Sequence, residues 1–238
     1  MKNSIIHKAN SRGHANHGWL DTHHTFSFAN YYEPDRMSFG VLRVLNDDII
    51  EGGAGFGKHP HDNMEIISIP IYGALAHKDS MGNASVIKES EVQVMSAGTG
   101  ILHSEFNGNE NKKANFLQIW IFPNEKNVTS RYDQKQFDIS ERQNKFQQVV
   151  SPFYDKEGLS IHQDAWMNLA NLDKEIALTY QRKKEGNGIY IFIIDGEVKI
   201  DDQTFEKRDG IGITDRDSVS IKALSDSQIL VMDIPMTV

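Results

Sequence analysis

Short strand-length segments bounded by turn-forming residues constrain the fold of this chain more than any other feature of its sequence. Apolar or alternating runs recur between clusters of Gly, Asn and Asp, which is the pattern of β-strands joined by tight turns. Long helical patterns are scarce, and Asp164–Leu172 is the segment that we expect to form a short helix. The sequence therefore predicts an all-β fold of small barrels or sandwiches. The predicted strands are Ser38–Leu45, Glu65–Ile71, Ala74–His77, Val92–Met95, Asn115–Phe122, Ile189–Ile194, Glu197–Ile200, Ile211–Thr214, Val219–Lys222 and Gln228–Met232.

Two local features refine the predicted strands of the first half. The segment Asp79–Asn83 contains Gly and Asn, which tolerate positive φ, so we expect a hairpin turn there. Pro70 lies inside an apolar run and cannot donate a hydrogen bond to a neighbouring strand. That strand should therefore be bulged, or exposed on one side, at Pro70.

The chain divides into two halves that look like weak repeats. In each half an apolar strand is followed by a Gly turn and a return strand, at Ile69–Leu75 and again at Phe192–Val198. Between the halves the sequence becomes polar, as a connecting region does. A length of 238 residues allows two small β domains. The predicted organisation is a first domain at 1–122, a connecting segment at 123–148 and a second domain at 149–238.

Composition excludes several classes of function. The net charge is −8 and no dense Lys/Arg block occurs, so direct binding to nucleic acid is not expected. Without cysteine, the chain has neither disulfides nor thiolate metal sites. No apolar run reaches the roughly 18 residues of a membrane span, and the first residues lack the apolar core of a signal peptide. We therefore expect a cytoplasmic protein.

Histidine is distributed unevenly, and its spacing suggests a metal site. Nine of the ten histidines lie within the first 103 residues, and only His162 lies beyond them. His59 and His61 stand two residues apart in a Gly-flanked segment, so on a strand both imidazoles project from one face. His103 and Glu105 repeat this spacing. If the two strands are neighbours, three nitrogens and one carboxylate oxygen converge and leave open positions for substrate or O₂.

These motifs resemble those of the cupin superfamily and, more specifically, of the pirin family. Gly53, His59, His61, Glu65 and Gly73 follow the first cupin motif, although Gly73 comes one residue late. The second motif matches at Gly100, His103 and Asn107, with Gly98 in place of the expected proline. Further pirin-like segments lie at 12–14, 18–20, 24–29, 32–34, 77–83 and 93–101.

The resemblance to pirins has specific implications for fold and site. It implies two cupin-type β-barrels (a bicupin) with one divalent metal, most often Fe(II), in the first barrel only. The metal ligands would be His59, His61, His103 and Glu105, and Zn, Ni, Cu, Mn or Co could replace Fe. Aligning the repeats places Arg182 where His59 stands and Lys184 where His61 stands, so we expect a metal-free second barrel.

Other residues in the first half have alternative interpretations. Glu65 occupies the position of a carboxylate ligand in many cupins, but support of a ligand is the favoured role. His77 is expected to be structural. The histidines at 14, 17, 23 and 24 lack ligand spacing and are expected to form hydrogen bonds or to pack. Barrel packing is expected for Trp19, Phe26, Phe28 and Trp120, and the pocket could include Met95 and Phe106.

The resemblance to bacterial pirin-like quercetin 2,3-dioxygenases implies an enzyme that opens a flavonol ring with O₂ and loss of CO. Glu105 would be the catalytic base, accepting the proton of the 3-hydroxyl group. Two alternatives remain open. One is a metal-binding regulatory or redox-sensing protein that acts through a protein partner without turnover. The other is an isomerase or hydrolase that uses Zn or Ni in the same site.

Overall fold

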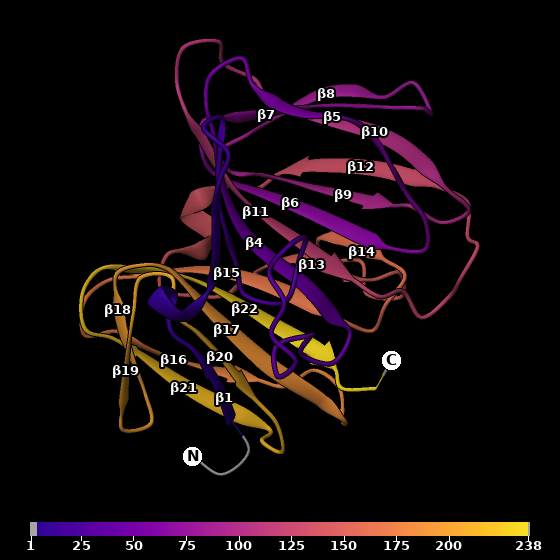
Figure 1. Ribbon diagram of the computed structural model, residues 1–238. Helices are drawn as coiled ribbons and strands as arrows, with labels where there is room; N and C mark the ends of the chain where they lie inside the picture. Colours follow the sequence, from indigo (N-terminus) through magenta and orange to yellow (C-terminus); the bar gives the residue numbers. More distant parts are fainter. Residues whose placement is uncertain (1–3, 238) are drawn as a thin grey trace.

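The computed structural model describes residues 4–237 and is built almost entirely of β-strands (Figure 1). The first barrel consists of a seven-stranded sheet, in the order β12-β9-β6-β11-β4-β3-β2, facing a four-stranded sheet, in the order β5-β10-β7-β8. Its strands are β2 (Gly13–Asn16), β3 (Leu20–His24), β4 (Leu42–Ile50), β5 (Gly55–His61), β6 (Glu65–Tyr72), β7 (Ala74–Asp79), β8 (Ala84–Lys88), β9 (Glu91–Ser96), β10 (Ile101–Asn107), β11 (Ala114–Ile121) and β12 (Arg131–Gln136).

The second barrel has the same arrangement of one large and one small sheet. The order is β1-β20-β17-β22-β15-β13-β14 in the large sheet and β16-β21-β18-β19 in the small one. Its strands are β1 (Ser4–His7), β13 (Gln147–Pro152), β14 (Leu159–Ile161), β15 (Trp166–Leu172), β16 (Ala177–Gln181), β17 (Asn187–Asp195), β18 (Glu197–Ile200), β19 (Gln203–Glu206), β20 (Gly210–Ile213), β21 (Ser218–Ala223) and β22 (Ser227–Pro235). Two short 3₁₀ helices, η1 (Ala9–Ser11) and η2 (Ile139–Arg142), complete the described elements.

The two seven-stranded sheets pack against each other and share one apolar core. Each strand alternates, so one set of side chains reaches this shared core while the other set faces the interior of its own barrel. On β6, for example, Ile67 and Ile69 pack into the shared core, whereas Ser68 faces the first barrel's interior. The interior of the second barrel is filled by aliphatic and aromatic side chains, including Ile191 and Ile221. The prediction of an all-β protein with two cupin-type barrels is confirmed.

The local predictions at the first hairpins are also confirmed. β7 and β8 pair through a turn at 80–83, in which Gly82 has φ = 98°. The register between β6 and β11 shifts beside Pro70, which is the expected bulge. The weak repeat corresponds to equivalent hairpins, because Gly73 (φ = 82°) ends β6 and Gly196 (φ = 84°) ends β17.

The predicted helix at Asp164–Leu172 is wrong, because Trp166–Leu172 forms strand β15 in the middle of the second large sheet. Both faces of β15 are buried: Met167 and Leu169 reach the shared core, and Ala170 and Leu172 reach the second barrel's interior. A strand buried on both faces loses the strict polar–apolar alternation, and its sequence can then imitate a short helix.

The strand predicted at Ser38–Leu45 lies instead at Leu42–Ile50, because the polar run Asn46-Asp47-Asp48 continues the strand. Asp47 forms an ion pair with Arg208 of the second barrel, with 2.8 Å between Oδ2 and Nε. Asn46 and Asp48 face a cavity inside the first barrel. Polar residues are thus tolerated on both faces of this central strand, which the local sequence did not indicate.

Two segments cross the domain boundaries expected from the sequence. β12 lies within the polar segment 123–148 but pairs with β9 at the edge of the first large sheet. β1 comes from the N-terminal segment but pairs with β20 in the second large sheet. The described residues contain no helix of the length and apolar character that a membrane span needs.

Candidate metal centre

Strands β5 and β10 of the small sheet bring the two sequence motifs together. They pair antiparallel, and His103 lies directly opposite His59. His61 follows on the same face of β5, two residues along, as the strand period predicts. The register then shifts between His103 and Glu105, which is a β-bulge next to the site. The local pairing therefore explains why residues about forty positions apart share one location.

The three imidazole rings converge on a common point. Ring centroids lie 4.4 Å apart for His59 and His103, and 4.9 Å apart for His61 and each of the other two. One nitrogen from each ring lies within 4.8 Å of the others, a spacing that a single metal ion can bridge. Nδ1 of His59 lies 2.7 Å from the carbonyl oxygen of Gly57 and must donate to it, so Nε2 of neutral His59 keeps its lone pair for a metal.

Burial favours the neutral, metal-binding form of the histidines. It lowers the pKa of His61 to about 4 and that of His103 to about 2, and the neighbouring histidines add to both effects. Neither ring nitrogen of the buried His103 has a hydrogen-bond partner among residues 4–237. Buried polar atoms without partners are costly, so this ring fits a ligand that is absent from the protein chain itself.

Glu105 is fully buried and belongs to a second group of potential metal ligands, together with His77 and His103. One carboxylate oxygen lies 3.2 Å from Oγ of Ser68 and the other 2.8 Å from Nε2 of Gln118, both of which donate hydrogen bonds. An oxygen of Glu105 lies within 4.8 Å of nitrogens on His103 and His77. Burial raises the pKa of Glu105 to about 7, against the effect of its two hydrogen bonds. The two potential metal groups thus share His103.

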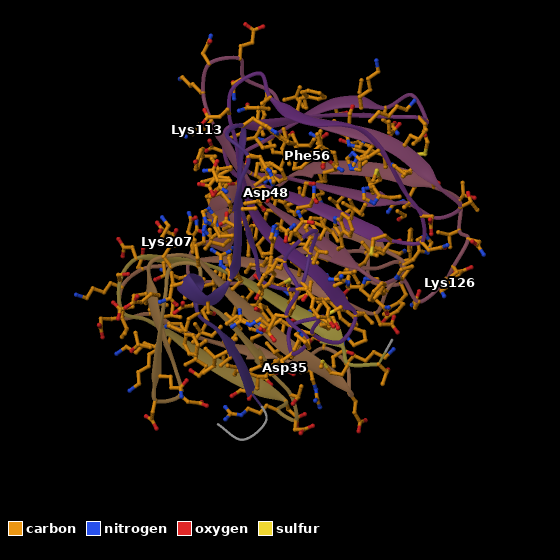
Figure 2. All side chains as sticks on the ribbon, in the orientation of Figure 1. Asp35, Asp48, Phe56, Lys113, Lys126 and Lys207 are labelled. Carbon is orange, nitrogen blue, oxygen red and sulfur yellow. The ribbon has the colours of Figure 1, made fainter. Side chains whose placement is uncertain are left out.

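His59 and His61 line a cavity of about 780 Å³ inside the first barrel. This volume lies in the range of small-molecule sites. Glu105 and Gln118 form part of its floor, and Figure 2 shows two further lining residues, Asp48 from the large sheet and Phe56 from the small sheet. The aromatic side chains that line the cavity are Trp19, Phe28, Tyr31, Phe56 and Trp120. Such walls suit a planar aromatic molecule.

A row of polar side chains crosses the first large sheet beneath the cavity. His24, Asn46, Gln118, Ser68 and Gln93 stand directly opposite one another on successive strands and are buried. This row was not predicted from the sequence. Ser68 and Gln118 are single polar residues between apolar neighbours on their strands, and that interruption was the available signal, whereas His24 and Asn46 lie in polar runs. The row makes the first barrel's interior polar where the second barrel's interior is apolar.

The expectations for Glu65 and His77 have different outcomes. Glu65 accepts a hydrogen bond from Ser96 and a main-chain hydrogen bond at His162, so its carboxylate faces the second barrel and contacts none of the proposed ligands. Strand β5 ends at His61 and β6 begins at Glu65, so the two residues lie on different strands. His77 forms a hydrogen bond with Asp79, at 3.2 Å, which agrees with a structural role, and its ring lies 5.3 Å from that of His103.

The remaining candidates line the cavity in part. His14 forms a hydrogen bond with Asp21 and stacks on His23, as expected of this cluster, and these three residues form a further, more exposed group with metal-ligand spacing. Trp19, Phe28 and Trp120 line the cavity in addition to packing, whereas Phe26 belongs to the shared core. Met95 and Phe106 lie outside the residues that line the cavity: Met95 packs in a small apolar cluster, and Phe106 is exposed on the outer face of β10.

Two facing β-barrels with a histidine-rich centre in one of them define a two-barrel cupin protein, or bicupin. A family profile described as Pirin matches residues 6–121, and a profile described as the quercetinase C-terminal cupin domain matches residues 148–234. The chain belongs to the pirin family.

The chain is similar to several known proteins over nearly its full length. The chain is 45% identical to "Quercetin 2,3-dioxygenase" of Escherichia coli K12 over 230 residues, which covers 97% of this chain and 98% of that protein. It is 40% identical to a "Pirin-like protein" of Caulobacter vibrioides, covering 93% of this chain and 95% of the relative. A crystal structure of the bacterial pirin YhhW from Escherichia coli in complex with nickel(II) superposes with a TM-score of 0.92 at 43% identity, covering 99% and 100% of the two chains.

Proposed function

We propose that His59, His61, His103 and Glu105 hold one divalent transition metal. The observation that carries this proposal is the convergence of three imidazoles, one of them buried without a hydrogen-bond partner in the described chain, beside a buried carboxylate. Nitrogen and carboxylate donors suit Fe(II), which is our first candidate, and also Zn, Ni, Cu, Mn and Co. The nickel(II) complex of a bacterial pirin supports a transition metal without selecting iron.

We further propose that the protein is a dioxygenase that opens the central ring of a flavonol such as quercetin. The chain is a quercetinase-like oxidoreductase by its similarity to a protein named for that activity. In the proposed reaction both atoms of O₂ add to the flavonol, at C2 and C4, and C3 leaves as CO, so the ring-opened ester and CO account for all atoms. When bound, the metal supplies a Lewis-acidic, redox-active centre for the 3-hydroxyl oxygen and O₂.

Residues of the cavity have separate roles in this proposal. Glu105 accepts the proton of the 3-hydroxyl group, and Ser68 and Gln118 keep its carboxylate oriented. The rings of Phe28 and Trp120, which lie edge to face at 5.3 Å, line the cavity, contact the planar substrate and exclude water. A cytoplasmic location and the lack of a metal in the second barrel stay predictions from the sequence.

The first test measures metal content and oxygen consumption together. Protein reconstituted anaerobically with each metal should bind about one ion per chain, and at least one metal should give O₂ uptake and CO release with quercetin. We expect His61→Ala to lower metal occupancy and Glu105→Gln to lower turnover by about 100-fold or more. His162→Ala, in the second half of the chain, is the matched control and should change neither quantity.

The outcomes separate the parts of the proposal. Full metal occupancy in His61→Ala would refute the ligand set. Absence of turnover with every metal, in protein that binds one ion, would refute the dioxygenase and favour a regulatory role through a protein partner.

A further inference from the structure

Asp48 is a buried carboxylic acid that the proposed reaction does not use. Its exposed fraction is 2%, and burial raises its pKa to about 7. Among the described residues its side chain has one hydrogen-bond partner, the hydroxyl group of Thr22, which donates to Oδ1. Burying a carboxyl group with so little compensation destabilises the fold, so stability does not explain this residue.

The adjacent residue shows how the same fold satisfies a structural carboxylate. Asp47 points to the opposite face of β4, where the Arg208 guanidinium lies 2.8 Å away and the amide of Asn115 donates a further hydrogen bond at 2.7 Å. Asp48 has no cation in contact within residues 4–237. The contrast between Asp47 and Asp48 indicates that Asp48 keeps hydrogen-bonding capacity for something outside the chain.

That capacity faces the cavity of the metal centre. Asp48, labelled in Figure 2, lines it from β4 of the large sheet. His59 and His61 line it from β5 of the small sheet. Thr22, directly opposite Asp48 on β3, lines it as well. The cavity lining therefore carries a second buried carboxyl group besides Glu105, on the large sheet, and Thr22 and Asp48 continue there into the polar row through His24 and Asn46.

We propose that Asp48, positioned by Thr22, forms a second binding subsite that accepts a hydrogen bond from a phenolic hydroxyl group of the substrate, away from the edge held at the histidines. The inference rests on the proposed flavonol-like substrate class and deepens it. The cavity selects planar aromatic molecules that carry hydroxyl groups at two separated positions. A hydrogen bond to a buried carboxylate contributes more than one between neutral groups.

Binding of two flavonols tests the subsite without requiring turnover. Quercetin and 3,5,7-trihydroxyflavone share the hydroxyl–carbonyl edge but differ in the two hydroxyl groups on the pendant ring. Their dissociation constants can be measured anaerobically on metal-loaded protein through quenching of Trp19 and Trp120, which line the cavity. We expect the wild-type protein to bind quercetin about tenfold more tightly, which is the effect of one good hydrogen bond.

Variants of Asp48 should remove this preference selectively. In Asp48→Leu, which has a similar volume and no acceptor, the two flavonols should bind equally, with the affinity for trihydroxyflavone unchanged. In Asp48→Asn, the conservative variant, the preference should fall to about threefold because the amide is uncharged. Glu110→Gln, an exposed carboxylate remote from the cavity lining, is the matched control and should keep the wild-type ratio.

Failure of this inference is distinguishable from failure of the dioxygenase proposal. A wild-type ratio near one, or a wild-type ratio kept in a folded Asp48 variant, would overturn the subsite whether or not oxygen is consumed. Absence of oxygen uptake with an intact, Asp48-dependent binding ratio would overturn the dioxygenase alone and support the subsite.

Discussion

His7 shows how one side chain can depend on both barrels. It lies on β1, with 2% of its surface exposed, and its Nδ1 is 2.7 Å from the hydroxyl oxygen of Tyr190 in the second barrel. On its other side the ring of Phe26 packs edge to face at 5.5 Å. Nε2 has no partner within the described chain. Protonation of this ring would place a positive charge in a buried environment next to an apolar side chain, which is unfavourable.

The burial of His7 predicts a loss of stability in acid. Burial, with a smaller contribution from Arg36, lowers its pKa to about 4 from the 6.5 expected in the unfolded chain. Between these values the unfolded chain binds a proton that the folded protein does not, so stability falls as pH falls from about 6.5 to 4. The loss amounts to about 3 kcal/mol when complete. In His7→Asn, the metal-free unfolding free energy should decline less steeply over this interval, as urea titrations at several pH values would measure. Parallel curves for the two proteins would contradict the prediction.

At the scale of elements, strand β7 lies between two hairpin turns, and each turn contains a glycine with positive φ. The space around these two glycines differs. Gly73 precedes β7 with φ = 82°, and a Cβ there would meet Cα of Ala114 at 2.9 Å. Gly82 follows it with φ = 98°, and a Cβ there would meet no atom within 4 Å. β7 pairs with β10, which carries His103 and Glu105. The position of β7 therefore affects the metal centre through its neighbour.

Alanine at these two glycines should separate backbone strain from steric overlap. Gly82→Ala should cost about 1 kcal/mol of unfolding free energy, the typical penalty for a positive φ alone. Gly73→Ala should cost about 2–4 kcal/mol, because overlap with β11 adds to the same penalty. Metal affinity should weaken in Gly73→Ala and remain unchanged in Gly82→Ala. Denaturant unfolding measures the loss of stability in each variant, and metal titration measures its metal affinity. Equal losses of unfolding free energy in the two variants would contradict the prediction, because the overlap at position 73 would then add no cost.

At the scale of the whole molecule, the two barrels are joined by a shared core and by buried polar contacts. Arg208 extends from the second barrel to Asp47 and to Asn115 of the first, with 2.8 Å and 2.9 Å contacts. Both barrels contribute large faces to the shared apolar core. We therefore expect the molecule to unfold as one cooperative unit, without a stage at which one barrel persists alone.

Loss of the Arg208 side chain should weaken this junction. Arg208→Met leaves the buried Asp47 carboxylate without its closest cation, and we expect a loss of about 3 kcal/mol in unfolding free energy. The control is Lys145→Met, because Lys145 forms an exposed ion pair with Glu141 and should cost less than about 1 kcal/mol. Calorimetry would measure both. A cost for Arg208→Met no larger than the control's would contradict a stabilising role for the junction.

The sequence by itself determined the strand content, the repeated hairpins and the positions of the histidine pairs. These features depend on local periodicity and turn chemistry, and on side chains two residues apart sharing one face of a strand. The convergence of His59, His61 and His103 then followed from a simple antiparallel pairing. The assignment of Glu105 as the fourth ligand stays a proposal.

Only the tertiary structure decided the features that depend on partners distant in sequence. β15 is a strand because sheet neighbours and two cores bury both of its faces, against its local resemblance to a helix. Asp47 and Asp48 are adjacent and chemically identical, yet one faces Arg208 and the other a cavity. The direction of each side chain from β4, and hence its charge environment, is fixed by packing between sheets, which no pattern within the local sequence specifies.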